Sequence, residues 1–366
     1  MIIGMDTSVI NLNQAGSAVY TSNLIEALRN LGCGDEFRLF DIGQTRDMSK
    51  SKTITSRLQT IYRDLIWAHT VLPYRTYKSK IDVLHIPVNV IPIFSNCPTV
   101  LTVHDTTILQ NPQNFTFWYR NYSRLFLPML AKKAKVILTV SENSKRDIVK
   151  QLKIPPEKVV VTYLAASDDF KTVSVRELER VKKCYNLDSF ILTVGSLEPR
   201  KNIPRLLQAY ASLLKKGFQH TLVHVGPKGW LYDEIYSEVE RLSLNEKVRF
   251  LGRIPLPDLV SLYNAATLFV YPSLYEGFGL PVLEAMACGC PVITSNISSL
   301  PEVAGDAGIL VDPSDVSQIA DSIESVCEDK QKAGLLKNAG IKRAKEFSWK
   351  RCAKETLDVY RLAATM

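Results

Sequence analysis

The chain has 366 residues, of which 46% are hydrophobic and 22% charged, a composition typical of a globular protein with room for two domains. No apolar run reaches the length of a membrane-spanning helix, and the first residues do not resemble a secretory signal, so we expect a cytoplasmic protein. The seven cysteines form no Cys-x-x-Cys spacing, which argues against a cysteine-based metal or redox site.

Short apolar runs typical of strands alternate with helical patterns, as in parallel sheets covered by helices. In the first half, strands are predicted at Met1–Met5, Phe37–Ile42, Val83–Ile86, Thr99–Val103, Val136–Val140 and Val159–Tyr163. Helices are predicted between them at Ser17–Leu31, Thr55–Ala68, Phe115–Lys133 and Glu142–Leu152. A second series has strands at Phe190–Val194, Thr221–Val225, Val248–Leu251, Leu268–Tyr271, Val292–Thr294 and Gly308–Val311.

The two series predict an α/β protein with two Rossmann-like, doubly wound domains that face each other across a cleft. The first domain is expected at residues 1–165 and the second at residues 186–345, with a linker between them. The tail, residues 349–366, has helical periodicity and no strand after it. We expect this last helix to pack back on the first domain.

The segment Pro272–Pro291 follows a predicted strand, so it begins at the sheet edge where such folds bind ligands. Gly277 and Gly279 permit close approach of the backbone, and the helix after them offers free N–H groups to a phosphate. Glu276 precedes this turn and Glu284 lies one helical turn beyond it. In this setting Glu284 is placed to accept the hydroxyls of a ribose, and Glu276 to contact a sugar beyond a diphosphate.

A second cluster, Gly195–Asn202, follows the strand Phe190–Val194. Arg200 and Lys201 then lie at the same sheet edge as Glu276. Two adjacent cations at this edge are suited to neutralising the charge of a departing diphosphate.

These two clusters, together with Phe250–Arg253 and Pro301–Gly305, resemble the donor domain of the retaining family 4 glycosyltransferases, which have the GT-B fold. The resemblance covers most of residues 186–345 and is looser in the first domain. It implies that Arg200 and Lys201 hold the diphosphate and that Glu284 binds the ribose. The other donor contacts that it implies are Gly195, Arg253, Ile254, Glu276, Gly277, Phe278, Gly279 and Leu280.

In the first domain the family has a double glycine after the first strand, where this chain has Ala15 and Gly16. The resemblance implies that the amide of Gly16 contacts the diphosphate, and that His104, at a strand end, contacts the sugar. Asp105 is as well suited to capping the following turn.

The family resemblance implies retention of anomeric configuration without a metal or other cofactor, and the sequence has no Asp-x-Asp motif at a strand end. The expected reaction is transfer of a hexose from a nucleotide diphosphate sugar to a glycan or lipid-linked saccharide. UDP-glucose is the favoured donor and GDP-mannose the second choice. A sugar-nucleotide epimerase and a non-catalytic nucleotide-sugar sensor remain as alternatives.

The net charge of +8 comes from one stretch of the first domain. The stretch Lys50–Lys135 holds twelve Lys and Arg residues against three acids. Basic and apolar residues mix within Thr53–Lys80 and Tyr119–Lys135, which suits either a solvated face or contact with an anionic membrane surface. We expect peripheral contact with the cytoplasmic face of a membrane, and no nucleic acid partner.

Overall fold

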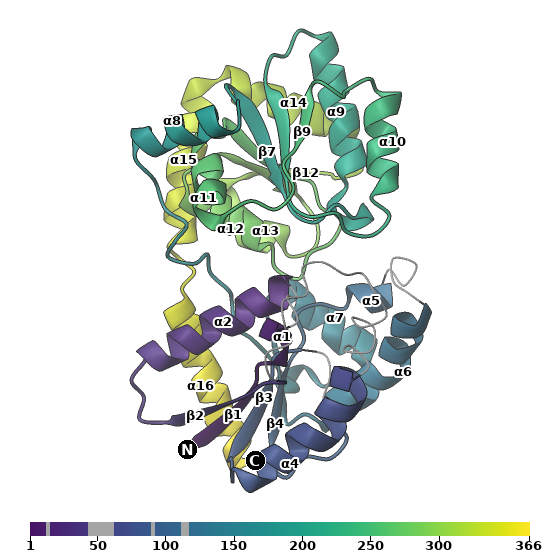
Figure 1. Cartoon of the computed structure of the whole chain (residues 1–366), viewed down its shortest axis with the longest axis vertical. Coiled ribbons are helices and arrows are strands. Elements are labelled where there is room, and N and C mark those ends of the chain that lie inside the picture. Colours follow the sequence, from purple (N-terminus) through teal and green to yellow (C-terminus); the bar gives the residue numbers. More distant parts are fainter. Residues whose placement is uncertain (12–14, 43–61, 89–91, 111–116) are drawn as a thin grey trace. The chain divides into compact units, whose positions relative to one another are not determined.

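The computed structural model of the chain describes residues 1–11, 15–42, 62–88, 92–110 and 117–366. The chain divides into two compact units: unit 1 contains residues 1–164 and 349–366, and unit 2 contains residues 165–348 (Figure 1). Each of the twelve predicted strands is present within two residues of its expected bounds. The α/β class and the two parallel sheets predicted from the sequence are therefore confirmed.

Unit 1 contains a six-stranded parallel sheet in the order β2-β1-β3-β4-β5-β6. Its strands are β1 (Ile2–Asp6), β2 (Glu36–Phe40), β3 (Val83–Ile86), β4 (Thr99–Thr102), β5 (Val136–Thr139) and β6 (Val159–Val161). All residues of β3, β4 and β5 are buried. Their runs of Val, Leu and Ile reflect a sheet that helices cover on both faces.

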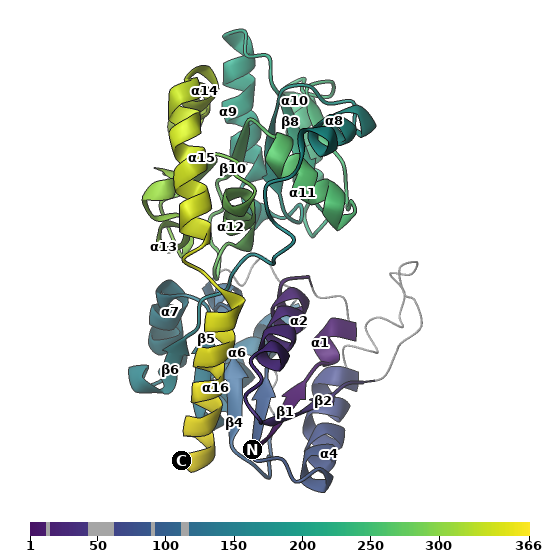
Figure 2. The ribbon, with the colours of Figure 1, turned by 90° about the vertical axis from the view of Figure 1, so that its left-hand side faces the viewer.

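The helical segments of unit 1 are α1 (Ser8–Asn11), α2 (Ala15–Asn30), η1 (Tyr62–Val71), α4 (Leu72–Lys78), α5 (Thr107–Gln110), α6 (Phe117–Lys133), α7 (Glu142–Leu152), η3 (Pro156–Lys158) and α16 (Trp349–Thr365). Helix α16 packs on α2 and on the central strands, so the last helix belongs to unit 1 (Figure 2). On the other face, a core that includes Trp67, Leu72, Leu127 and Ile148 joins η1, α4, α6 and α7 to the sheet.

Unit 2 contains a second parallel sheet in the order β12-β11-β10-β7-β8-β9. Its strands are β7 (Phe190–Val194), β8 (Thr221–Val225), β9 (Val248–Phe250), β10 (Leu268–Tyr271), β11 (Val292–Ser295) and β12 (Ile309–Val311). This is the strand order of dinucleotide-binding folds, in which the chain reverses direction across the sheet between the first and fourth strands. Here the reversal lies between β7 and β10.

The helical segments of unit 2 are α8 (Val175–Cys184), η4 (Pro199–Lys201), α9 (Ile203–Lys215), α10 (Asp233–Arg241), α11 (Leu256–Ala265), α12 (Leu280–Ala287), α13 (Leu300–Ala304), η5 (Gly305–Ala307), α14 (Val316–Glu328) and α15 (Lys330–Ala344). Helices α9, α10 and α14 share one core with the sheet. Helix α12 instead packs against α11, α15 and β10.

Parts of two predicted helices, Thr55–Ala68 and Phe115–Lys133, lie outside the described residues, as do Lys50, Lys52 and Arg57 of the basic stretch. In the described part of Thr55–Ala68, the helical segment continues to Val71 before α4 begins. Among the described residues, every helix is too short or too polar to cross a bilayer.

Candidate active site

The two clusters predicted from the sequence lie at neighbouring strand ends in unit 2. Strand β7 leads into the loop that carries Arg200 and Lys201, and β10 leads into the loop that carries Glu276. The strands pair directly, Leu268 with Ile191 and Phe269 with Leu192. Because the chain reverses direction between β7 and β10, both loops border the crevice where folds of this kind bind ligands.

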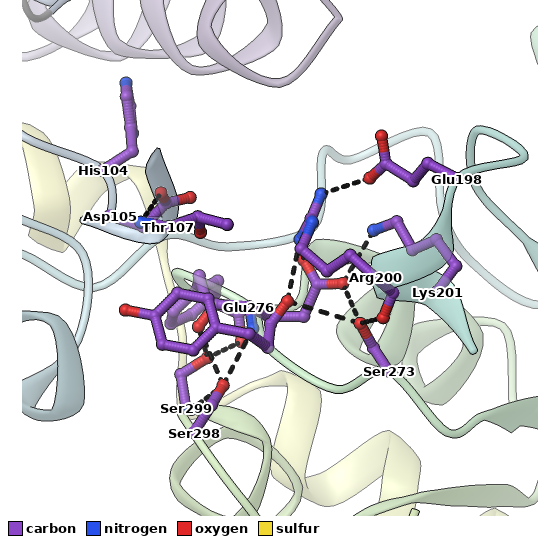
Figure 3. Close-up of polar contacts among 12 residues, drawn as sticks. His104, Asp105, Thr107, Glu198, Arg200, Lys201, Ser273, Glu276, Ser298 and Ser299 are labelled. Carbon is purple, nitrogen blue, oxygen red and sulfur yellow. Dashed lines mark hydrogen bonds and ion pairs between the residues drawn. The ribbon is translucent and has the colours of Figure 1, made fainter. Parts of the chain in front are cut away.

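Glu276 is the centre of a buried polar cluster between these two loops (Figure 3). Its Oε1 accepts hydrogen bonds from Lys201 Nζ at 2.7 Å, Ser273 Oγ at 2.6 Å and Tyr271 Oη at 2.8 Å. Its Oε2 accepts from Arg200 Nη1 at 2.6 Å. The sequence-predicted residues Arg200, Lys201 and Glu276 are therefore brought together.

The cluster balances its own charge. Arg200 also forms an ion pair with Glu198, at 2.7 Å, so two cations face two carboxylates. Burial by itself would raise the pKa of the Glu276 carboxyl, but Arg200 and Lys201 outweigh burial and lower this pKa to about 2. Glu276 is thus ionised at neutral pH, and it forms ion pairs with both Arg200 and Lys201 in the ligand-free protein.

Backbone hydrogen bonds hold the two loops together. The carbonyl of Arg200 accepts from the amide of Leu274 at 2.8 Å, and its oxygen lies 3.0 Å from Ser273 Oγ. Asn202, in a left-handed conformation with φ 59°, donates its side-chain amide to the carbonyls of Pro272 and Pro313. These bonds position the Arg200 and Lys201 side chains against Glu276.

The glycine-rich turn before α12 is held by two serines. Ser298 Oγ donates to the carbonyl of Glu276 at 2.9 Å, and Ser299 Oγ lies 2.9 Å from the same carbonyl oxygen and 2.7 Å from that of Phe278. Gly279 caps α12 with φ 110°, and a Cβ there would lie 2.7 Å from Leu300 Cδ2. The turn therefore requires glycine at 279, and the backbone amides of the first turn of α12 lie at the ligand edge.

Glu284 lies in α12, half-buried, and accepts a hydrogen bond from Tyr263 Oη at 3.0 Å. Burial raises the pKa of Glu284 to about 7, and the hydrogen bond from Tyr263 offsets only part of this rise. The two glutamates of the motif thus have opposite electrostatic surroundings: Glu276 is held ionised by cations, and Glu284 titrates near neutral pH.

Close backbone contacts join the ends of β7, β8 and β9. A Cβ on Gly226 would lie 1.8 Å from the carbonyl oxygen of Gly195, and the amide of Gly226 donates to the carbonyl of Gly252 at 2.9 Å. Arg253, which follows Gly252, is exposed, and Ile254 is half-buried. The predicted base-contacting loop thus lies at the same sheet edge, two strands from the cluster.

In unit 1, His104 follows β4 and is half-buried. Its Nε2 lies 3.1 Å from the carbonyl oxygen of Pro87, and its ring meets the Tyr20 ring edge-on at a centroid distance of 4.8 Å. Burial lowers the pKa of the His104 imidazole, which favours the neutral ring. Asp105 accepts from the amide of Thr107 at 2.9 Å, so it caps the turn that leads into α5.

A buried chain of hydrogen bonds surrounds Tyr20 and was not predicted. Tyr20 Oη lies 3.2 Å from Thr102 Oγ1, which lies 2.7 Å from His85 Nε2, and His85 Nδ1 lies 2.6 Å from Tyr360 Oη. This chain ties α16 to β3, β4 and α2. Gly16 lies exposed in the first turn of α2, with open space where a Cβ would be.

Sequence reasoning also missed the residues that surround the unit 2 cluster: Glu198, Tyr263, Tyr271, Ser273, Ser298 and Ser299. Glu198, Tyr271 and Ser273 contact residues two to five positions away, but nothing in the motif spacing distinguishes them from other polar or aromatic residues. Tyr263, Ser298 and Ser299 reach the glutamates from more than 20 residues away, so the motifs carry no signal for them. The described residues contain no group of three or more His, Cys, Asp or Glu side chains arranged to hold a metal ion.

Two protein-family models match the chain. The model described as "Glycosyl transferases group 1" matches residues 174–343, and "Glycosyltransferase Family 4" matches residues 15–169. O-antigen chain mannosyltransferase B of Escherichia coli is 41% identical over 266 residues, which cover 72% of this chain and 70% of that protein. The chain belongs to glycosyltransferase family 4. It is therefore an enzyme that transfers a glycosyl group.

Other relatives of this family 4 glycosyltransferase have related names. O-antigen chain mannosyltransferase RfbU of Salmonella typhimurium is 31% identical over 64% of this chain and 62% of its own length. The chain spans about a third of the serotype-specific mannosyltransferase WbdA of Escherichia coli, to which it is 34% identical over 71% of its own length.

Solved structures agree on the fold. Sucrose-phosphate synthase from Thermosynechococcus elongatus superimposes with a TM-score of 0.80 at 22% identity, covering 99% of this chain and 98% of that one. Anabaena HepE in complex with UDP and glucose gives a TM-score of 0.76 at 18% identity, covering 98% and 99%. The family 4 chain therefore has the GT-B fold expected from its sequence.

Proposed function

We propose that this glycosyltransferase moves a mannosyl group from GDP-mannose to a lipid-linked glycan, with retention of anomeric configuration. The observation that carries this proposal is the 41% identity to O-antigen chain mannosyltransferase B over most of both chains. From the sequence alone we expect UDP-glucose as the donor, with GDP-mannose as the second choice. The mannosyltransferase relatives instead favour GDP-mannose. The structures that contain UDP and glucose share 18% identity and support the fold alone.

Each part of the unit 2 site has a proposed role. Arg200, Lys201 and the amide of Leu280, at the N-terminus of α12, bind the diphosphate, because charge-assisted hydrogen bonds and a helix N-terminus both favour anions. Glu284 accepts the ribose hydroxyls. Glu276 and the Gly277–Gly279 backbone contact the transferred sugar, and Arg253 with Ile254 contacts the base. Gly195 allows the close backbone approach that the diphosphate needs.

The proposed reaction is a same-face displacement. The bond between the sugar C1 and the phosphate oxygen breaks, and its electron pair stays on the phosphate. The acceptor hydroxyl oxygen bonds to C1 on the same face and passes its proton to the departing phosphate. Arg200 and Lys201 stabilise the negative charge that develops there, and in unit 1 His104 contacts the sugar while Gly16 offers its amide to the diphosphate.

The balanced charge of the cluster supports a diphosphate role. A carboxylate that holds two cations in the ligand-free protein keeps their side chains ordered, so little conformational entropy is lost when an anionic donor arrives. We propose that the donor phosphates take over part of the contact that Glu276 makes with Arg200 and Lys201. Glu276 is then released to bind a sugar hydroxyl.

The acceptor is proposed to be lipid-linked, as an O-antigen precursor would be, and the enzyme to contact the membrane that carries it. The catalytic groups proposed here need no metal, because side chains and a helix end stabilise the leaving group.

The test is a donor panel. The purified protein is incubated with GDP-mannose or with UDP-glucose, each with and without an undecaprenyl-diphosphate-linked saccharide as acceptor. The mass of the lipid product is then measured by mass spectrometry. A hexose added from GDP-mannose alone supports the proposal. Efficient addition from UDP-glucose, with none from GDP-mannose, overturns the donor assignment, and sugar turnover without any acceptor product favours an epimerase.

A further inference from the structure

Exposed apolar side chains gather on one side of unit 1. Tyr74 and Tyr77 of α4 are 65% and 68% exposed, and Phe94, in the segment 92–98, is 78% exposed. Ile93 lies beside Phe94, and Phe126 and Met129 of α6 are also exposed. We call the surface formed by these six residues the α4–α6 face. Both helices lie on the side of the sheet away from α16 (Figure 1).

Side-chain hydrogen bonds join the parts of this face. The amide of Ile93 donates to His69 Nδ1 at 3.2 Å, and Lys133 Nζ donates to the carbonyl of Ile93 at 2.9 Å. The Asn96 side chain lies 3.4 Å from the carbonyl of Pro73, at the start of α4. The segment 92–98 therefore bridges the start of α4 and the end of α6.

The helices of this face also carry exposed cations. Arg75 and Lys78 belong to α4, Lys132 and Lys133 end α6, and all four are exposed. Lys133 Nζ lies 5.6 Å from the centre of the Phe94 ring. Phe94, Lys133, Lys135 and Met366 line a groove of about 510 Å³, and Lys135 Nζ donates to the main-chain oxygen of Met366 at 3.3 Å. The sequence has no Asp or Glu in residues 65–81, 83–104 or 106–141. Helix α4, the segment 92–98 and helix α6 therefore contribute no Asp or Glu side chain to neutralise these cations.

We propose that the α4–α6 face docks the enzyme on an anionic lipid bilayer. This inference rests on the proposed function, because a lipid-linked acceptor is held at such a surface. Aromatic side chains mixed with Lys and Arg are typical of segments that lie in a membrane interface, where the rings enter the headgroup region and the cations attract acidic lipids.

A protein partner fits this face less well. Protein–protein interfaces concentrate apolar residues in a core that is depleted of lysine, with charges at the rim. Here Lys133 lies over the ring of Phe94, the most exposed aromatic residue of the face, rather than at a rim around it. The groove beside Phe94 is suited to a lipid headgroup, because a phosphate can pair with Lys133 while acyl carbons contact the Phe94 ring.

The experiment is co-sedimentation of the whole protein with two kinds of vesicle, phosphatidylcholine alone and phosphatidylcholine with phosphatidylglycerol. We expect binding to the acidic vesicles at low salt and weaker binding at physiological salt. The double variant Lys78→Glu/Lys132→Glu should lower the ratio of bound to free protein by more than about 25-fold, since the loss of each cation costs about fivefold and each new carboxylate is repelled by the acidic surface. Phe94→Ser should lower it about tenfold.

Matched controls lie in unit 2. Lys342→Glu/Lys345→Glu reverses two exposed lysines, one in the last turn of α15 and one directly after it, and Leu335→Ser replaces an exposed apolar residue of α15. Both should bind as the wild type does. Wild-type protein that stays in the supernatant with acidic vesicles at low salt, or controls that lose as much binding as the α4–α6 variants, would overturn the proposal.

Activity is measured in parallel on a short acceptor dispersed in detergent. The α4–α6 variants should keep wild-type turnover there, because no bilayer is involved. If the wild type itself fails to transfer mannose in detergent yet binds acidic vesicles, the proposed function is wrong and the docking surface stands. If transfer proceeds in detergent and vesicle binding is absent, the docking inference alone is wrong.

Discussion

The Nζ atom of Lys201 lies 2.7 Å from Oε1 of Glu276, in a cluster that Arg200 joins through Oε2 of the same carboxylate. One glutamate thus forms ion pairs with both of the cations that we propose to bind the donor diphosphate. An incoming nucleotide donor has to compete with Glu276 for these cations, and this competition leads to the first prediction.

Replacing Glu276 by Gln should strengthen the binding of GDP while abolishing mannosyl transfer. The amide keeps the shape of the side chain, but it removes the negative charge that neutralises Arg200 and Lys201. We expect GDP to bind about tenfold more tightly, which corresponds to about 1.4 kcal/mol, as measured by isothermal titration calorimetry. Weaker GDP binding by the variant would show that the two cations do not hold the diphosphate.

Replacing Lys201 by Ala should reduce both turnover and stability. Loss of a charge partner at the leaving group costs on the order of 10²-fold in rate, measured well below the melting temperature. Because Lys201 is buried and its loss leaves Glu276 with one partner fewer, unfolding should become easier by about 3 to 5 kcal/mol.

The control for this variant is Lys216→Ala, which removes an exposed lysine paired with Glu324. Its stability and turnover should stay close to those of the wild type, because surface ion pairs contribute little. Equal losses in the two variants, or normal turnover in Lys201→Ala, would contradict the assignment.

Glu284 should make the protein less stable as the pH rises. Its folded-state pKa of about 7 lies above the ordinary value of 4.5, so the folded chain keeps a proton that the unfolded chain releases. The stabilisation is complete below pH 4.5 and is lost as the pH rises to about 7, by at most about 1.4 kcal/mol per pH unit.

Thermal unfolding of Glu284→Gln and the wild type at pH 5 and pH 8 checks this prediction. The melting temperature of the variant, relative to the wild type, should be higher at pH 8 than at pH 5. Glu240→Gln, at an exposed position of α10, should show the same difference at both values. A difference for Glu284→Gln that does not change with pH would mean that the carboxyl is ionised throughout this range.

Chelation should leave transfer unchanged. Arg200, Lys201 and the N-terminus of α12 supply the positive charge that a metal provides in other enzymes. Dialysis against EDTA, followed by a transfer assay with and without added Mg²⁺ or Mn²⁺, measures the dependence. Activity that disappears on chelation and returns with either ion would show that the leaving group is stabilised by a metal.

The strands and the two main loops could be predicted because local sequence determines them. Runs such as Val83–Ile86 are apolar throughout, and the glycines around Phe278 identify a turn before a helix. The electrostatic state of the site could not be predicted. Whether Glu276 contacts the cations or solvent depends on the pairing of β7 with β10, which brings residues 75 positions apart to within 2.7 Å.

Contacts between residues far apart in the sequence also could not be predicted for the glycine-rich turn before α12 or for the core of unit 1. Ser299 contacts Glu276 from 23 residues away, and Tyr360 contacts His85 from 275 residues away. Neither pair has a local pattern. The basic and apolar residues of α6 were visible in the sequence, but the contribution of Phe94 emerged only when the segment 92–98 was seen to bridge α4 and α6.

The most direct test of this account is the anomeric configuration of the product. Purified protein transfers ¹³C-labelled mannose from GDP-mannose to the lipid-linked acceptor, and the one-bond carbon–proton coupling at C1 is measured by NMR. We predict a mannosyl product with the same anomeric configuration as the donor, which Glu276→Gln does not form. An inverted product, or a retained product that Glu276→Gln forms at the wild-type rate, would contradict the account.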